Sequence, residues 1–356
     1  ILIFKISMIK VTYLLPELKG ASGGAKVIYN HSLLLNKINN EISSQVVHLK
    51  KKTSYKLQLS LAKRAKFFDN NLVGWNPKKM KVSKDFTPDK SWFSRKIEKS
   101  KDLNFESKKD FIVIPEIWAH FAEDLNLKKR KIRYSIFVQG SYHMNSHENF
   151  EKIKLSYEKA DFILTTSEYS LNFIKNLFPK CKNKILKINL STKYQTIKKF
   201  NKINLITTIS RKLPSHLQLL LFYLKNKLPN NWKLEILENI DDAQLKKKLL
   251  KSKIFLSFSH FEGFGLPPLE AALAGNKIIG YDGGGGKEYW KDPIFTKINY
   301  GEIYEFGEKI LKSINQYNSS WIKKTHQQRL FLAKKYSMEA EKVSLSILCD
   351  KIIKLY

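Results

Sequence analysis

The sequence predicts an α/β protein with two domains, each built on a parallel sheet. Short apolar runs of strand length recur along the chain and alternate with segments of helical periodicity. Glycine-rich loops follow several of these runs, as they do in nucleotide-binding βαβ units. A length of 356 residues is sufficient for two domains of ordinary size. Each domain is therefore predicted to be Rossmann-like, with its ligand-binding loops at the carboxyl ends of the strands.

The first domain is predicted to span residues 8–196. Its opening unit consists of a strand, a glycine loop, a helix and a second strand, at Ile9–Leu15, Lys19–Gly24, Ala25–Leu35 and Val46–Leu49. The loop lacks the full G-x-G-x-x-G pattern, so the sequence does not support binding of a nicotinamide dinucleotide.

Two later strands of this domain end in polar residues. Phe111–Ile114 leads to Glu116, and Tyr134–Val138 leads to Gln139 and His143. Because the carboxyl ends of parallel strands meet at one edge of a sheet, these three side chains are candidates for one binding surface. Gln139 and His143 can hydrogen-bond to hydroxyl or phosphate groups. A structural role for each remains the alternative.

The second domain is predicted to span residues 197–337, after the lysine-rich run Asn189–Asn204. Its first strand, Leu205–Ile209, ends close to Arg211 and Lys212. Cations at a strand end suit a diphosphate, and arginine can bind one in a bidentate manner. Surface charge ahead of a helix is the alternative interpretation.

The most informative stretch of this domain is Phe255–Trp290. It contains a buried strand, a glycine loop, a helix opened by prolines and a second strand. Gly263 and Gly265 remove side chains that would keep a phosphate or sugar from the backbone. The free N–H groups of the following helix suit an anion. Glu262 and Glu270 flank this loop, eight residues apart.

This stretch resembles the donor-binding signature of retaining glycosyltransferases of the GT-B fold, family 4. The resemblance rests on the E-x7-E spacing of Glu262 and Glu270 and on the GFGLP loop between them. The PEIWA and IFVQGSYH segments, which contain Glu116 and Gln139, resemble those of bacterial surface-polysaccharide enzymes. The resemblance implies two Rossmann-like domains that face each other across a cleft. It also implies a C-terminal helix, residues 338–356, that crosses back to the first domain.

The resemblance also implies roles for individual residues. Glu262 would contact sugar hydroxyls, and Glu270 would accept hydrogen bonds from the ribose. The loop residues and the glycine pair of the first domain would border the donor: Gly263, Phe264, Gly265, Leu266, Gly23 and Gly24. Glu116, Gln139 and His143 would lie on the acceptor side. The family separates its arginine and lysine by several residues, whereas Arg211 and Lys212 are adjacent here, so which one reaches the phosphate stays open.

The activity implied is transfer of a hexose from a nucleotide-diphosphate sugar to a glycan or lipid-linked acceptor. Retention of configuration and a role in cell-surface polysaccharide synthesis follow from the same resemblance. No cofactor beyond the donor and no metal is expected, since no convincing strand end carries a DxD-type site. A catalytically degenerate partner subunit of the same fold, and a basic nucleic-acid-binding protein, are the alternatives.

The net charge of +32 is carried mostly by lysine, since only six of the 64 cationic residues are arginine. A genome rich in A and T accounts for much of this excess, and the diffuse lysines do not predict nucleic-acid binding. Residues 50–109 combine lysines with Trp75 and Trp92, which suits contact with an anionic membrane. Gly283–Lys287 is not a phosphate loop, because Glu288 stands where Ser or Thr is required.

Cys181 and Cys349 are the only cysteines and predict neither a disulfide framework nor a zinc site. No apolar run reaches the length of a transmembrane helix. We therefore expect a cytoplasmic protein, with contact at the inner face of the membrane. Ile1–Ser7 precede Met8 and are expected to lie upstream of the true start. In the C-terminal helix, Val343, Ile347 and Ile353 are predicted to form one apolar face.

Overall fold

The structure, a computed structural model, describes residues 8–17, 23–51, 80–82, 105–145, 147, 149–192, 194, 201–209, 212–238 and 240–356. The chain forms two compact units. The first ends at Ile188 and is completed by Lys342–Tyr356, and the second comprises Asn189–Glu341. The predicted boundary after residue 196 falls within residues 195–200, which lie outside the described part, and it stays a prediction.

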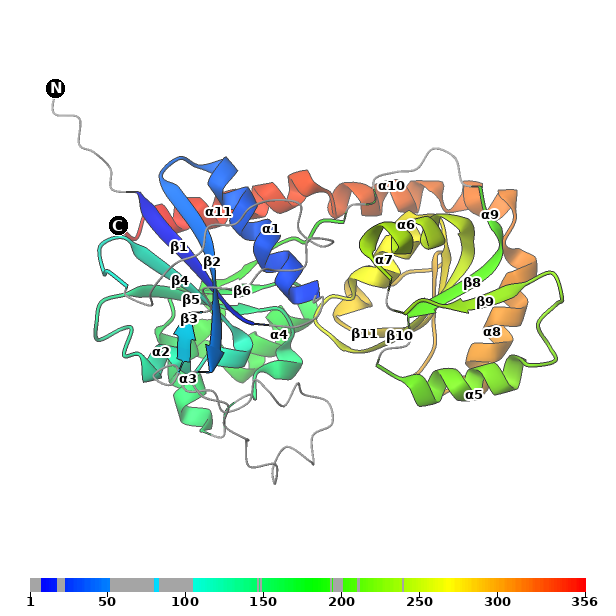
Figure 1. Cartoon of the computed structure of the whole chain (residues 1–356), viewed down its shortest axis with the longest axis horizontal. Helices are drawn as coiled ribbons and strands as arrows, with labels where there is room; N and C mark the ends of the chain where they lie inside the picture. The colour runs from blue at the N-terminus through cyan, green and yellow to red at the C-terminus, as the bar shows by residue number, and fades with distance from the viewer. Residues whose placement is uncertain are drawn as a thin grey trace. The chain divides into compact units, whose positions relative to one another are not determined.

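The first unit is built on a seven-stranded sheet in the order β3-β2-β1-β4-β5-β6-β7 (Figure 1). Six strands run parallel, at Ile9–Pro16 (β1), Ile42–Lys51 (β2), Asp110–Pro115 (β4), Arg133–Val138 (β5), Phe162–Thr165 (β6) and Ile185–Lys187 (β7). The edge strand β3, Met80–Val82, pairs antiparallel with β2. All six residues of β4 are buried, as expected for a strand covered on both faces.

Four α-helices and three short 3-10 helices connect these strands. They are α1 (Gly23–Ile38), α2 (Phe121–Asp124), α3 (Phe150–Lys159), α4 (Glu168–Leu177), η3 (Glu116–Trp118), η4 (Ser141–His143) and η5 (Pro179–Lys184). Side chains cap two of the helices. Asn149 accepts from the Lys152 N–H at 2.9 Å and begins α3, and Ser167 accepts from the Ser170 N–H at 3.3 Å and begins α4.

The second unit has a five-stranded parallel sheet in the order β12-β11-β10-β8-β9. The strands are β8 (Ile203–Ile209), β9 (Lys233–Ile236), β10 (Ser252–Glu262), β11 (Lys277–Gly284) and β12 (Phe295–Lys297). The helices are α5 (Pro214–Leu224), α6 (Asp242–Lys251), α7 (Leu266–Leu273), η6 (Gly285–Glu288), α8 (Ile303–Gln316), α9 (Ser319–Lys324) and α10 (His326–Lys335).

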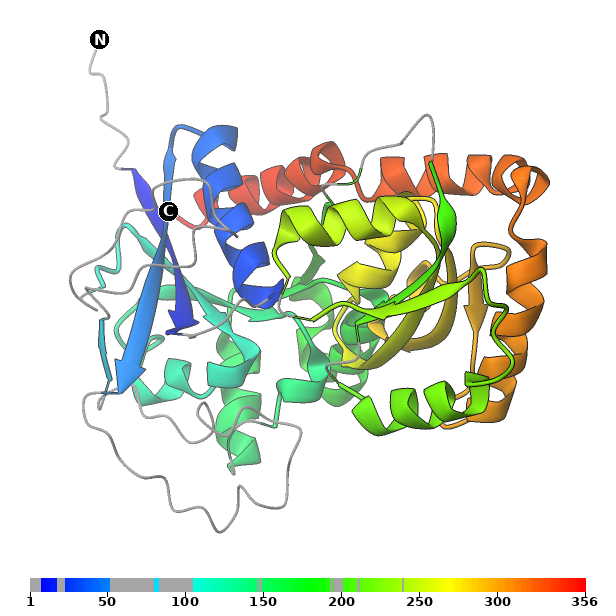
Figure 2. The ribbon, with the colours of Figure 1, turned by 45° about the vertical axis from the view of Figure 1, so that its right-hand side comes forward.

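Helices cover both faces of this second sheet. α5 and α8 pack together on one face, where Leu217 and Leu220 of α5 join Phe306 of α8 in a core with the strands. α6 and α7 lie against the other face, as both views show (Figures 1 and 2). The strands therefore end at an edge where the β8–α5, β10–α7 and β11–η6 loops gather, which is the edge that binds ligands in open parallel sheets.

The C-terminal helix α11, Met338–Ile353, returns to the first unit, as predicted. Its buried side chains are Leu345, Leu348, Cys349 and Ile352, which join the core of β1 and α1. The predicted apolar face was wrong, because Val343 is 56% and Ile347 50% exposed. The buried set has the i, i+3, i+4, i+7 spacing of a complete helical stripe, whereas the predicted set lies beside it.

The two cysteines are both buried thiols and form no disulfide with each other. Cys181 lies in η5, and Cys349 lies in α11. Within the described part of the chain, no helix combines the length and the apolar composition needed to cross a membrane.

Candidate functional site

Glu262 lies at the carboxyl end of β10, the central strand of the second sheet. The sequence predicts a strand that stops at Phe258, but β10 continues to Glu262. The strand continues because its register against β11 shifts after Ser259, and Glu262 then pairs with Gly284. Phe261 takes a positive φ of 49° within this irregularity. Glu262 is therefore held by the sheet itself and not by a free loop.

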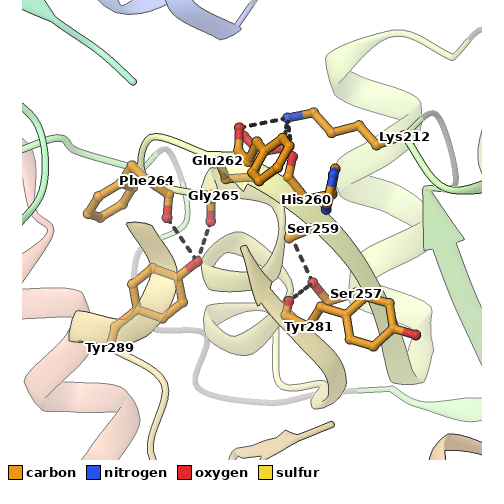
Figure 3. Close-up of polar contacts among 10 residues, drawn as sticks. Lys212, Ser257, Ser259, His260, Glu262, Phe264, Gly265, Tyr281 and Tyr289 are labelled. Carbon is orange, nitrogen blue, oxygen red and sulfur yellow. Dashed lines mark hydrogen bonds and ion pairs between the residues drawn. The ribbon is translucent and has the colours of Figure 1, made fainter. Parts of the chain in front are cut away.

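Lys212, which follows β8, folds back onto the same strand end (Figure 3). Its Nζ lies 2.8 Å from Glu262 Oε1 and donates to the carbonyl oxygens of His260 at 3.0 Å and Phe261 at 3.4 Å. Both charged side chains are about one third exposed, at 32% for Lys212 and 29% for Glu262. The structure thus brings together two of the predicted residues. Arg211 lies outside the described residues.

The glycine loop after Glu262 is shaped by close backbone packing. Gly265, the N-cap of α7, has φ +80°, and a Cβ there would lie 3.0 Å from the Tyr289 hydroxyl. A Cβ on Gly285 would lie 2.0 Å from the carbonyl oxygen of Gly263. The glycine run after β11 therefore packs directly against the loop between β10 and α7, and side chains at these positions would separate the two segments.

Tyr289 is a part of this site that sequence reasoning missed. Its hydroxyl donates to the carbonyl oxygens of Gly265 at 2.5 Å and Phe264 at 3.3 Å (Figure 3). Burial raises the pKa of Tyr289 well above its usual value, so the phenol stays protonated and remains a donor. The only signal in the sequence is an aromatic residue shortly after the glycine run, which alone does not indicate a loop contact.

The side chain of Phe264 is buried beneath the loop. Its ring lies 5.5 Å from the Tyr289 ring and 5.3 Å from the Tyr336 ring, measured between centroids. Any contact of Phe264 with a ligand therefore falls to its backbone. Glu270 lies one turn inside α7, and the backbone at Leu266 begins the helix. The predicted roles of Gly263, Leu266 and Glu270 toward a donor stay predictions.

In the first unit, three predicted residues come together at the strand ends. Glu116 follows β4 and accepts from the Gly140 N–H at 3.0 Å, while Gln139 follows β5 and donates to the Gly24 carbonyl oxygen at 3.0 Å. Hydrogen bonds thus join the ends of β4 and β5 to the start of α1. His143 ends the neighbouring helix η4.

Glu116 is almost fully buried, and burial raises the pKa of its carboxyl to about 7, against the opposing effect of backbone N–H donors. Its contacts position the loop at Gly140 and do not present the carboxylate to solvent. Gly23 opens α1, and nothing lies within 4 Å of a Cβ built on it. The acceptor-side roles of Glu116, Gln139 and His143, and the donor contact of Gly23 and Gly24, are not decided by these placements.

A family comparison matches the second unit. Residues 217–328 match the family model described as Glycosyl transferases group 1. This segment contains Glu262, the glycine loop, Glu270 and Tyr289. The chain carries a glycosyl transferase group 1 domain. A comparison with curated protein sequences gives no match.

Solved structures resemble the whole chain. TarM from S. aureus, in complex with fondaparinux, alpha-GlcNAc-glycerol and UDP, has a TM-score of 0.62 at 14% identity over 98% of this chain and 99% of its own. Sucrose-phosphate synthase from Thermosynechococcus elongatus has 0.66 at 10% identity over 98% and 100%. The lipopolysaccharide outer core galactosyltransferase WaaB, in its apo form, has 0.59 at 13% identity over 98% and 100%. The predicted GT-B fold is confirmed by these likenesses.

Among the described residues of this GT-B chain, no group of three or more His, Cys, Asp and Glu side chains could hold a metal ion. The chemical resources of the group 1 domain are therefore one carboxylate, one ammonium group and the backbone N–H groups of a glycine loop. These groups lie at the carboxyl edge of the sheet, where a helix begins. Such a set can bind an anion and orient hydroxyl groups.

Proposed function

We propose that the protein transfers a hexose from a nucleotide-diphosphate sugar to a glycan or lipid-linked acceptor, with retention of configuration. The observation that carries the proposal is the position of Glu262 and Lys212. They lie at the end of β10 beside the glycine loop and the start of α7, inside the segment that matches the glycosyl transferase family. A catalyst of this reaction must stabilise a diphosphate leaving group and orient a sugar.

The ion pair suggests how these two tasks are linked. In the proposed reaction the donor diphosphate displaces Glu262 as the partner of Lys212 and receives further hydrogen bonds from the N–H groups at the start of α7. Glu262, released from Lys212, then accepts hydrogen bonds from the sugar hydroxyls. Glu270 binds the ribose hydroxyls. Binding of the correct donor would therefore set up both catalytic groups in one step.

Retention is proposed to occur by attack on the same face from which the diphosphate leaves, with the leaving phosphate accepting the acceptor proton. A two-carboxylate mechanism of the glycosidase type would need a second carboxylate about 5–5.5 Å from Glu262. Metal independence is part of the same proposal. TarM bound to UDP and the galactosyltransferase WaaB support the choice of UDP sugars as first candidates and of surface polysaccharide as the product class.

Contact with an anionic membrane stays a proposal based on the lysines and tryptophans of residues 50–109, most of which lie outside the described part of the chain. It would place the reaction at the cytoplasmic face, where a lipid-linked acceptor could be reached. Binding to vesicles of phosphatidylglycerol, compared with vesicles of phosphatidylcholine, would measure this contact.

A thermal-shift screen against UDP, GDP, ADP and dTDP and their sugars tests the proposed function. A ligand present at about 100 times its dissociation constant adds roughly 2.7 kcal/mol to stability. One nucleotide class should therefore raise the melting temperature. A screen without any response would contradict the proposal, and binding without turnover would favour the degenerate partner subunit. A shift with oligonucleotides alone would favour the nucleic-acid-binding alternative.

Two variants then separate the proposed roles. Glu270→Ala should weaken nucleotide binding by about tenfold, the effect of losing one hydrogen bond to a charged group. Glu262→Ala should lower turnover of the sugar nucleotide far more than it lowers nucleotide affinity. Glu305→Ala, at an exposed position of α8, is the matched control. Nucleotide affinity that is the same in Glu270→Ala and the native protein would remove Glu270 from the site.

A further inference from the structure

Three aromatic side chains form a contiguous stack beside Glu262. The ring of His260 lies 3.9 Å from that of Phe261 and 5.1 Å from that of Tyr300, measured between centroids. The outer members are open to solvent, since Phe261 is 44% and Tyr300 58% exposed. Phe261 directly precedes Glu262 in the chain. The stack therefore presents aromatic surface next to the carboxylate of the candidate site.

The backbone holds Phe261 in this exposed position at a cost. Its φ of 49° is in the left-handed region, which is unfavourable for a bulky side chain and persists only where surrounding contacts enforce it. Lys212 supplies such contacts by donating to the carbonyl oxygens of His260 and Phe261. Strain of this kind is concentrated at functional sites, and here it places an aromatic ring where a fully relaxed strand would not.

Tyr300 is held from the other side by Tyr281. The Tyr281 hydroxyl accepts from the Gly301 N–H at 3.4 Å and shares a hydrogen bond of 3.0 Å with His216 Nδ1. The Tyr300 ring lies 5.0 Å from the His216 ring and 5.5 Å from the Tyr281 ring. The loop that carries Tyr300 is thus tied to α5 and β11. Both exposed rings are fixed before any ligand arrives.

The stack is uncharged at neutral pH. Burial, together with the nearby charges of Lys212 and His216, lowers the pKa of His260 below its usual value, although Glu262 opposes the shift. A neutral, rigid aromatic surface is a poor site for a phosphate. It suits a ligand with an apolar face, and the adjacent Lys212 and Glu262 suit the hydroxyl groups of the same ligand. Sugar rings combine these two properties, because their C–H bonds gather on one face.

We propose that Phe261, His260 and Tyr300 form a subsite that packs against the C–H face of a pyranose ring of the substrate. This inference rests on the proposed function, which supplies two sources of such a ring, the donor sugar and the acceptor glycan. In either case the stack would fix the orientation of the sugar relative to Glu262. Tyr300 and Phe261 would then be residues that determine sugar specificity.

The test compares Tyr300→Ala and Phe261→Ala with Tyr304→Ala. Tyr304 is a matched control because it is also an exposed tyrosine, 69% exposed in α8, but it packs against Tyr223 and not against the stack. Calorimetry with UDP, UDP-N-acetylglucosamine, maltotriose and chitotriose measures each part of the substrate separately. Tyr300→Phe, which keeps the ring, should bind as the native protein does and shows whether the fold is intact.

A donor-sugar subsite predicts about tenfold weaker binding of UDP-N-acetylglucosamine in both alanine variants, with UDP binding unchanged. An acceptor subsite predicts the same loss for a trisaccharide. The proposal is overturned if the alanine variants bind every sugar as the native protein does, or if UDP binding falls in parallel. It is also overturned if the native protein binds neither trisaccharide and does not distinguish UDP-N-acetylglucosamine from UDP.

The same measurements separate this proposal from the proposed function. A protein that binds UDP but shows no sugar dependence at the stack keeps the transferase assignment and loses the subsite. A protein that binds a trisaccharide through Tyr300 but binds no nucleotide keeps the subsite and loses the transferase assignment.

Discussion

At the scale of single residues, the candidate site is defined by contacts that the motif does not contain. The sequence predicts Glu262, Lys212 and the glycine loop, and the structure brings all three to one strand end. It could not predict that Tyr289 anchors the loop, because a hydroxyl-to-carbonyl contact across 24 residues leaves no periodic signal. It also could not predict that Lys212 pairs with Glu262, since the spacing of the two residues along the chain is unrelated to their distance in space.

Glu116 gives the residue-scale prediction. Its pKa is raised to about 7 by burial, whereas the unfolded chain titrates near the ordinary value of 4.5. Between these values the folded protein binds more protons than the unfolded one, so this group's contribution to stability falls as pH rises from about 4.5 to 7. Glu116→Gln, which stays neutral, should lack this dependence, and the difference from the native protein should change by up to about 3 kcal/mol.

Urea unfolding of the native protein and Glu116→Gln at pH 5, 6, 7 and 8 measures this difference. Glu151→Gln, at a position of α3 whose side chain is 66% exposed, is the control and should show no such trend. A constant difference between native protein and Glu116→Gln across the range would show that the carboxyl is not perturbed.

At the scale of secondary-structure elements, the sequence predicts the strands and helices of the second unit well, because each has a clear start or stop signal. Pro267 in the first turn and Gly275 after the last one, with φ +91°, mark the ends of α7. The length of β10 was not predictable in the same way. Its extension to Glu262 depends on pairing with Gly284 of β11 after a register shift, which is a tertiary contact.

Lys202 gives the element-scale prediction. Its Nζ donates to the carbonyl oxygens of Leu249 in α6 at 2.9 Å and Ala274 after α7 at 2.6 Å, and so joins the ends of the two helices. Burial lowers its pKa to about 6. The unfolded chain holds the proton up to the ordinary value of 10.5, so this lysine makes stability rise as pH increases from about 6 toward 10.

Lys202→Met should therefore change the pH dependence of unfolding as well as its midpoint. The stability of the native protein relative to this variant should increase by about 2 kcal/mol or more between pH 6 and pH 9. Lys248→Met, which removes an exposed ammonium group from α6, serves as the comparison. A relative stability that is flat with pH would mean that Lys202 stays charged beneath the helix ends.

At the scale of the whole molecule, the fold class follows from the alternation of strands and helices, and the return of α11 follows from the resemblance that the sequence carries. The face that α11 buries was predicted wrongly, because Val343 and Ile347 are as apolar as the residues that pack. Hydrophobicity alone does not choose between two adjacent stripes of one helix. The choice is made by the core formed by β1 and α1, which is distant in the sequence.

Two neighbouring residues of α11 test this packing. Leu348 is fully buried, so Leu348→Ala should destabilise the first unit by about 2–5 kcal/mol through lost contacts and a cavity. Ile347, which is 50% exposed, has a side chain of the same composition, and Ile347→Ala should cost less than about 1 kcal/mol. Chemical unfolding monitored by tryptophan fluorescence measures both variants, and equal losses would refute the assigned face.

The position of α11 also determines the order in which the protein can be completed on the ribosome. The first unit needs Lys342–Tyr356, and the second unit, Asn189–Glu341, is encoded between these residues and the rest of the first. Domains generally fold as they emerge, at about 5–20 residues synthesised per second. Here the nascent first unit must wait, with the surface that receives Leu345, Leu348 and Ile352 uncovered, until the second unit has left the exit tunnel. The domain that is translated first is therefore the domain that is finished last.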